Sequence, residues 1–147
     1  MNICIKHFNE LTAEELYEIY KVRTKVFVVE QNCPYQEVDG IDKTAYHIWL
    51  YDDSGIKSYL RLFMADEKNK NAAAIGRVLA TERRCGYASA AMEEAVKAAK
   101  EKLGAEKIIL DAQCYARGLY DMLGFKQTSG EFLIDGIPHI KMELDLK

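Results

Sequence analysis

The sequence has few of the features that mark specialised protein classes. It has no C-x-x-C pair: its four cysteines, Cys4, Cys33, Cys85 and Cys114, lie far apart with no histidine cluster nearby. A tetrahedral structural zinc site needs paired ligands at short spacing, so the sequence predicts no metal site. Because nothing in it suggests secretion, we expect no disulfide framework either.

Two further absences limit the partners of the protein. No apolar run approaches the roughly 20 residues that a membrane-spanning helix needs, and Met1–Phe8 carries Lys6 and His7 where a secretory signal would be apolar. The 20 Lys and Arg are outnumbered by 23 Asp and Glu, which gives a net charge of -3. Proteins that coat nucleic acid or anionic membranes normally have a strong basic excess. We therefore expect a cytoplasmic protein that binds neither nucleic acid nor membrane.

The composition nevertheless favours a folded domain with a real core. Hydrophobic residues occupy 49% of the 147 positions and only two residues are proline, so one domain over residues 1–147 is expected. Apolar periodicity predicts strands at 2–8, 45–51, 56–65, 72–80, 107–111, 125–134 and 139–146, and helices at 13–28, 86–103 and 115–123. The polar segment 30–43, with Pro34 and Asp39-Gly40, is predicted to be a loop. Strand 72–80, the following helix and strand 107–111 form a β-α-β unit, so these two strands should be parallel in a mixed α/β sheet.

The turn before the long helix, RRCGYA at residues 83–88, is the most informative segment. A helix N-terminus offers unpaired amides and the positive end of the helix dipole, and it therefore attracts phosphate. Gly86 and Ala88 remove bulk there, while Arg83 and Arg84 add positive charge. The alternative interpretation is a glycine at a tight turn beside two solvated arginines. Because neither G-x-x-x-x-G-K-[ST] nor G-x-G-x-x-G occurs, phosphate binding would follow another scheme.

Two motifs carry a resemblance to a known family. Arg83-x-x-Gly86-x-Ala88 matches the acetyl-CoA signature Q/R-x-x-G-x-G/A of the GNAT acetyltransferase superfamily, with Arg84 where that family usually has glycine. The segment 113–125, QCYARGLYDMLGF, resembles the second signature N-x-x-A-x-x-x-Y-x-x-L-G-F. VFVVEQ at 26–31, IGRV at 75–78, AQ at 112–113 and DGIPH at 135–139 are similar to the ElaA-like subgroup. The resemblance covers nearly the whole chain.

The resemblance implies a GNAT-like single α/β domain. Its central twisted sheet would be mixed and mostly antiparallel, with a β-α-β unit, flanking helices and strands splayed at the cofactor site. It also implies an N-acetyltransferase that uses acetyl-CoA as co-substrate, needs no metal, and transfers the acetyl group to a primary amine by direct attack in a ternary complex. The acceptor would be a small molecule or a peptide, and a homodimer is an open alternative to a monomer. A non-catalytic acyl-CoA-binding module of the same fold is the competing hypothesis.

The same resemblance implies roles for individual residues. The pantetheine arm would pair with the backbone of Val78, Leu79 and Ala80, one of whose amides would hold the developing oxyanion. Gln113 would bond the amides of the cofactor. Tyr120 would protonate the departing thiolate, since a phenol keeps its proton at neutral pH. The pyrophosphate would lie on the amides of Arg83, Arg84, Cys85, Gly86, Tyr87, Ala88 and Ser89.

The attacking amine needs help to lose its proton. A lysine-like amine with a pKa of about 10.4 is mostly protonated at pH 7, and neutralising it costs about 4.6 kcal/mol. The candidate bases are Glu30, His47, Glu82 and His139. Of these four, we predict that Glu30 and His139 are catalytic. Arg23 and Arg61 either line a pocket for an acceptor with a negative group or form ion pairs.

Overall fold

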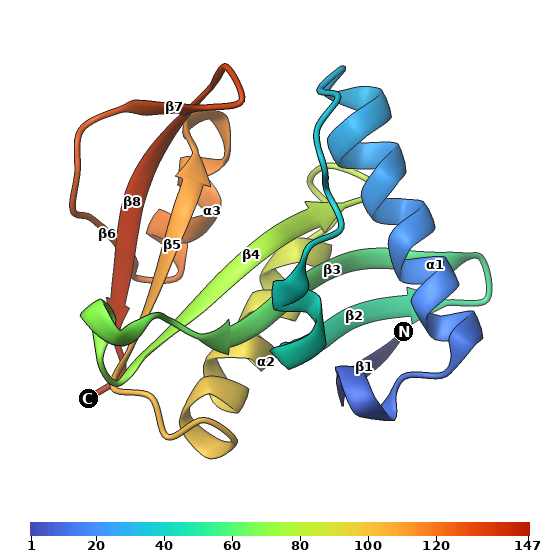
Figure 1. The fold of residues 1–147 in the computed structure, drawn as a ribbon, viewed down its shortest axis with the longest axis horizontal. Coiled ribbons are helices and arrows are strands. Elements are labelled where there is room, and N and C mark those ends of the chain that lie inside the picture. Colours follow the sequence, from blue (N-terminus) through green and yellow to red (C-terminus); the bar gives the residue numbers. More distant parts are fainter.

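A computed structural model describes residues 1–147 of the protein. An eight-stranded mixed sheet forms its centre (Figure 1). The strands are β1 (Asn2–His7), β2 (Tyr46–Asp52), β3 (Gly55–Met64), β4 (Ala72–Ala80), β5 (Lys107–Gln113), β6 (Lys126–Gln127), β7 (Phe132–Ile134) and β8 (Ile137–Asp145). Their order across the sheet is β1-β2-β3-β4-β5-β8-β6, with β7 also paired to β8. β4 and β5 are parallel, and the other pairs are antiparallel. The predicted mixed, mostly antiparallel sheet is therefore confirmed.

Three α-helices connect the strands, namely α1 (Ala13–Arg23), α2 (Tyr87–Glu101) and α3 (Arg117–Met122). α1 begins at a capping box in which Thr12 and Glu15 each bond the backbone N–H of the other. Beyond Arg23 the chain winds as a π-helix over Thr24–Glu30, where the sequence predicted one regular helix to residue 28. π-helical turns are rare and frequently occur at functional sites. None of the helices is long and apolar enough to cross a membrane.

Each face of the sheet has its own core, because successive side chains of a strand point to opposite faces. Ile48 and Leu60 pack with α2 residues such as Met92 on one face. Their chain neighbours Trp49 and Tyr59 pack on the other face with apolar residues of α1 and of the π-helix. α1 and α2 therefore cover opposite faces of the β2–β4 part of the sheet (Figure 1).

Two segments differ from the prediction. The strand predicted at 125–134 is wrong in its middle: β6 and β7 are separate short strands, and both pair with β8. The residues between them, TSGE, lack the apolar alternation that would hold a strand against the core. The predicted loop 30–43 contains a short 3-10 helix, Gly40–Thr44, which begins where the Asp39 carboxylate accepts a bond from the Ile41 amide at 3.1 Å.

The sheet opens between its two parallel strands. β4 and β5 pair only from Ala72↔Lys107 to Ala74↔Ile109. Beyond this point β4 stays with β3 as far as Ala80, while β5 stays with β8 as far as Gln113. The two strands therefore diverge, and Figure 1 shows the V-shaped gap between their ribbons. The splay implied by the family resemblance is present.

A β-bulge in β4 lies inside the splayed region. The pairing of β3 with β4 shifts between Tyr59↔Leu79 and Arg61↔Gly76, and Arg77 has φ of 54°. A bulge adds one residue and reverses the side-chain alternation beyond it. Ile75 accordingly packs with α2, whereas Leu79, four residues later, packs on the face of α1.

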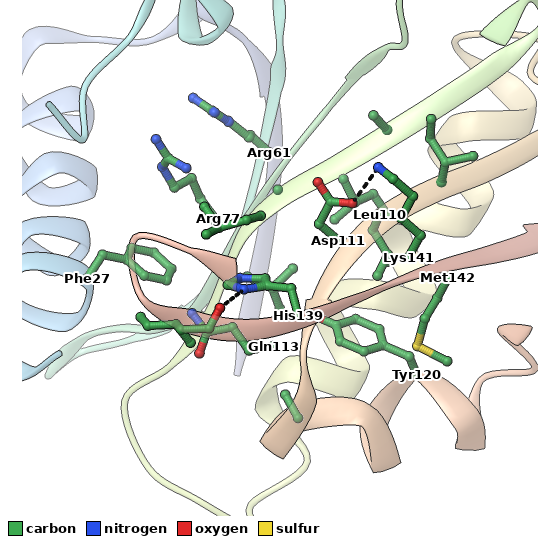
Figure 2. A pocket seen from close by; sticks show the side chains of 18 of the residues that line it. Phe27, Arg61, Arg77, Leu110, Asp111, Gln113, Tyr120, His139, Lys141 and Met142 are labelled. Atoms are coloured by element: carbon green, nitrogen blue, oxygen red, sulfur yellow. Dashed lines mark hydrogen bonds and ion pairs between the residues drawn. The ribbon is translucent and has the colours of Figure 1, made fainter. Parts of the chain in front are cut away.

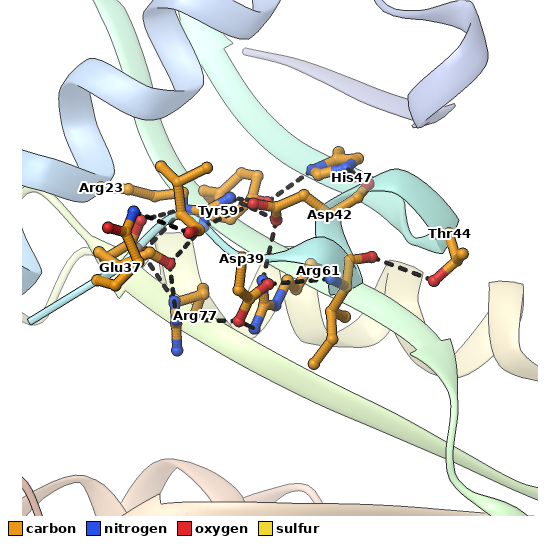
Figure 3. A network of polar contacts seen from close by, with 12 residues as sticks. Arg23, Glu37, Asp39, Asp42, Thr44, His47, Tyr59, Arg61 and Arg77 are labelled. Carbon is orange, nitrogen blue, oxygen red and sulfur yellow. Dashed lines mark hydrogen bonds and ion pairs between the residues drawn. The ribbon is translucent and has the colours of Figure 1, made fainter.

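A buried network of ion pairs fixes the loop that precedes β2 (Figure 3). The fully buried Arg23 binds Glu37 through Nε at 2.9 Å and Asp42 through Nη1 at 2.8 Å. Arg61 binds Asp42 at 3.0 Å and Asp39 at 2.7 Å. Burial alone would raise the pKa of Asp42, but bonds from Arg23 and Arg61 outweigh it and leave that pKa below its ordinary value. Asp42 is therefore ionised in the folded protein at neutral pH.

Asp42→Asn should destabilise the protein by about 3–5 kcal/mol at pH 7, because it leaves two buried arginines short of a partner. A lowered carboxyl pKa stabilises the fold above the unfolded pKa, here 3.8, and this stabilisation is lost as pH falls through the folded pKa. The difference between wild type and variant should therefore shrink below about pH 4. Urea unfolding at several pH values measures it. Asp121→Asn, which removes an exposed ion pair with Arg117, is the control and should cost at most about 1 kcal/mol.

Arg84, in the turn between β4 and α2, has φ of 61°, a left-handed conformation that costs a residue with a Cβ roughly 1–2 kcal/mol. Arg84→Gly should therefore be more stable than Arg84→Ala by about 1 kcal/mol. Both variants lack the guanidinium, so the difference in their stability measures the cost of the left-handed backbone conformation alone. Thermal unfolding measures the difference, and an equal or higher stability of the alanine variant would contradict the left-handed turn.

Candidate functional site

A cavity of about 540 Å³ occupies the open end of the sheet (Figure 2). Its lining comes from β3, β4, β5 and β8, from α3, and from the π-helix and the loop that follows it. Five residues singled out from the sequence lie in this lining: Arg61, Val78, Gln113, Tyr120 and His139. These residues are far apart in the chain, and the divergence of β4 from β5 brings them to one place.

Tyr120 reaches the cavity from α3. Its side chain is 5% exposed, and its ring packs edge-on against Phe125 with centroids 5.9 Å apart. Burial raises the pKa of the Tyr120 phenol above its usual value, with a smaller contribution from Tyr115. The phenol therefore keeps its proton at neutral pH and can act as a proton donor.

His139 lies on β8, next to Gln113 in the register of β5 and β8. Its Nδ1 is 2.7 Å from the carbonyl oxygen of Ile137. Because a carbonyl only accepts, Nδ1 carries the hydrogen, and Nε2 of the neutral ring keeps its lone pair. The ring also stacks on Phe132, with centroids 6.2 Å apart. The imidazole is thus held in one orientation with a basic nitrogen available.

Gln113, at the end of β5, forms an amide pair with Gln31, at the end of the π-helix. The Nε2···Oε1 distances are 3.3 and 3.5 Å. This contact joins two segments 82 residues apart in the sequence. Sequence reasoning did not single out Gln31, although it falls within the VFVVEQ segment.

Other lining residues were also missed from the sequence, among them Phe27, Tyr35, Arg77, Asp111 and Lys141. Asp111 shares a face of β5 with Gln113, so the period of two along the strand could have identified Asp111 as a lining residue. Lys141 binds Asp111 at 3.2 Å. Phe27 falls within the helix that periodicity predicts at 13–28, but nothing in that pattern indicates that its side chain lines a cavity.

The predicted phosphate-binding turn lies outside this lining, at the far end of β4. Arg83, Arg84, Cys85 and Gly86 are exposed. Gly86 is the N-cap of α2, has φ of 74°, and provides no side-chain bond to the helix. The first amides of this 15-residue helix are therefore uncapped by side chains, and two exposed arginines precede them. These groups fit a diphosphate. Two of the β4 residues predicted to pair with the pantetheine arm are also placed: Leu79 is buried against the α1-side core, and Ala80 is half-buried.

The candidate bases occupy different environments. Besides His139, none of them lines the cavity. His47 is buried, with Nε2 2.9 Å from the Asp42 carbonyl and Nδ1 2.7 Å from the Tyr59 hydroxyl, and burial lowers its pKa. Glu82 is exposed and lies 3.7 Å from Lys57, and Glu30 is exposed.

The two arginines considered as anion receptors form ion pairs instead. Arg23 is fully buried and lies outside the cavity lining. Arg61 lines the cavity, but its Nη1 already binds Asp39 and Asp42. Of the two alternatives left by the sequence, the structure shows the ion pairs. No group of three or more histidine, cysteine or acidic side chains converges into a possible metal site.

Comparison with known proteins agrees with this geometry. Residues 9–146 match the family model of the acetyltransferase (GNAT) domain. A UPF0039 protein of Schizosaccharomyces pombe is 42% identical over 145 residues, which are 96% of this chain and 95% of the relative.

Two solved structures show the same fold. An acyl-CoA N-acyltransferase from Pseudomonas aeruginosa is 37% identical, with a TM-score of 0.86 over 97% of this chain and 99% of its own. Escherichia coli ElaA is 30% identical, with a TM-score of 0.88 over 97% of each chain. The chain therefore belongs to the GNAT acetyltransferase family and is ElaA-like within it.

Proposed function

We propose that the protein is an acetyl-CoA-dependent N-acetyltransferase that transfers an acetyl group to a primary amine in a ternary complex. One observation carries the proposal: the cavity brings the protonated phenol of Tyr120 and the basic Nε2 of His139 to the splayed strand β4. Amine acylation by direct attack needs one group that takes a proton, one that gives a proton, and a backbone donor for the oxyanion. The open end of the sheet offers all three.

The co-substrate would be held along β4 and at the start of α2. Residues Arg83 to Ser89 provide amides and two positive side chains for the diphosphate. The backbone of Val78, Leu79 and Ala80 lies beyond the last β4–β5 pair, so its β5 side is available to the pantetheine amides. Gln113 can bond these amides if it exchanges its Gln31 partner for them.

His139, and not Glu30, would be the general base. His139 lines the cavity with a free Nε2, whereas Glu30 is exposed and lies outside the lining. Nε2 would accept the proton of the attacking ammonium, directly or through one water. The amine nitrogen then attacks the acetyl carbonyl while an amide of the 78–80 segment bonds the oxygen that becomes negative.

Tyr120 would act as the general acid. It would give its proton to the sulfur of coenzyme A as the C–S bond breaks. The nitrogen of the tetrahedral intermediate gives its second proton to His139, which has released the first to solvent, and the product is the N-acetylated amine. A leaving thiolate is a moderate base, with a pKa near 8.5 for a cysteine-like thiol. The acceptor remains a small molecule or a peptide with a primary amine.

Tyr120→Phe should bind acetyl-CoA as well as wild type but transfer the acetyl group about 10²-fold more slowly, because the leaving thiolate loses its proton donor. Thiol release against a panel of amines measures the rate, and calorimetry measures the binding. Tyr17→Phe, an exposed tyrosine on α1, is the control. Normal turnover of Tyr120→Phe would remove this residue from the chemistry, and absence of turnover in wild type would favour a binding module.

Coenzyme A at 100 times its Kd should add about 2.7 kcal/mol to the free energy of unfolding. Arg83→Ala should weaken this binding, and the loss should be larger at low than at high salt because the contact is electrostatic. Thermal unfolding with and without coenzyme A, at two salt concentrations, measures both effects. Lys97→Ala, on the exposed face of α2, removes the same charge elsewhere and should leave the affinity unchanged. Equal affinities of wild type and Arg83→Ala at low salt would contradict the phosphate site.

A further inference from the structure

We propose that Glu37 and Arg77 form a clamp that holds the bulge of β4 and thereby positions the Val78 backbone for acetyl transfer. The inference rests on the proposed function and adds a pair of positioning residues to the same site. Neither side chain is assigned a contact with the transferred group. Their role is to fix the strand segment whose amide would hold the oxyanion.

The bulge determines how Val78 faces the cavity. Arg77 has φ of 54°, and the β3–β4 register shifts at this residue. In an unbroken strand Val78 would lie on the same face as Gly76, but its side chain packs instead with the α2-side core. The left-handed residue thus places the isopropyl group on the α2 side of the sheet, while Val78 still lines the cavity.

Non-glycine residues in this conformation are strained and persist only where their surroundings hold them. The ion pairs, hydrogen bonds and cation–π contact of the Arg77 side chain all come from the loop before β2. Its Nε lies 2.7 Å from Glu37 Oε2, an ion pair outside hydrogen-bond alignment, and its Nη2 donates to the Glu37 carbonyl at 2.8 Å. Its guanidinium also lies 3.4 Å from Asp39 and 5.6 Å from the centroid of the Tyr35 ring.

The loop side of the clamp is itself fixed. The Glu37 side chain is 4% exposed, and its carboxylate also binds the fully buried Arg23 of α1 at 2.9 Å. Arg23 is in turn held by Asp42 at 2.8 Å. Figure 3 shows these contacts in a continuous series that ends at Arg77. The bulge is thus tied to α1 through the charge pairs of Arg77 with Glu37 and of Glu37 with Arg23.

Comparison of Arg77→Ala with Arg77→Gly tests the clamp, because both variants lose the same contacts and leave Glu37 paired with Arg23. Alanine keeps the cost of the left-handed conformation, whereas glycine adopts it freely. We expect kcat of Arg77→Gly to exceed that of Arg77→Ala by at least about tenfold, since a misplaced oxyanion donor costs about 10²–10³. The KM for acetyl-CoA should differ by less than about threefold between them, as expected for a loss confined to the transition state.

A second measurement does not depend on turnover. The amide resonance of Val78 in a ¹⁵N–¹H spectrum should move away from its wild-type position in Arg77→Ala and stay close to it in Arg77→Gly. Asn71, whose φ is 62°, provides the matched control outside the cavity. Asn71→Ala and Asn71→Gly should differ in thermal stability but not in kcat.

Three outcomes would overturn the clamp: equal kcat values of the two Arg77 variants, a difference confined to KM, or an unmoved Val78 resonance in Arg77→Ala. Failure of the proposed function gives a different result, namely no thiol release by wild type with any amine. The Val78 resonance then still decides whether Arg77 holds the strand.

Discussion

The parting of β4 from β5 is the constraint on which the rest of the site depends. Parallel pairing ends at Ala74↔Ile109, and each strand then keeps its other neighbour. A sheet interior normally has no free backbone groups, because unpaired buried amides and carbonyls are costly. Here the splay leaves one edge of β4 and one edge of β5 facing a cavity. An extended ligand with its own amides can pair with such an edge as a strand would.

The electrostatics of the cavity wall follow from the loop network. Three arginines, Arg23, Arg61 and Arg77, are matched by Glu37, Asp39 and Asp42. Of the three, Arg61 and Arg77 line the cavity, and because both are already paired, neither offers a free positive charge on this wall. The same pairs have a structural role: together with the packing of Tyr35 on the α1-side core, they hold the loop against α1 and β3.

The sequence predicted the sheet, the helices and the turn before α2, because periodicity and capping are local signals. It also predicted Tyr120, His139, Val78 and Gln113, which all line the cavity, though through the family resemblance rather than through spacing. It could not predict the left-handed Arg77 or the partners of Arg23. A bulge is a property of two strands in register, and a buried ion pair joins residues whose proximity only the fold decides.

The proposed chemistry balances its protons without a net change in the protein. The ammonium loses two protons on its way to the amide: one passes through His139 to solvent before the attack, and His139 takes the second from the tetrahedral intermediate while Tyr120 gives its own proton to the thiolate. The hydrogen bond from His139 Nδ1 to the Ile137 carbonyl holds the ring in place throughout, since Nδ1 donates in both the neutral and the charged ring. Burial of Tyr120 has the opposite effect on its anion, because a phenolate is destabilised away from water. The tyrosine must therefore regain a proton quickly, and the nearby imidazolium is the group that has one to return.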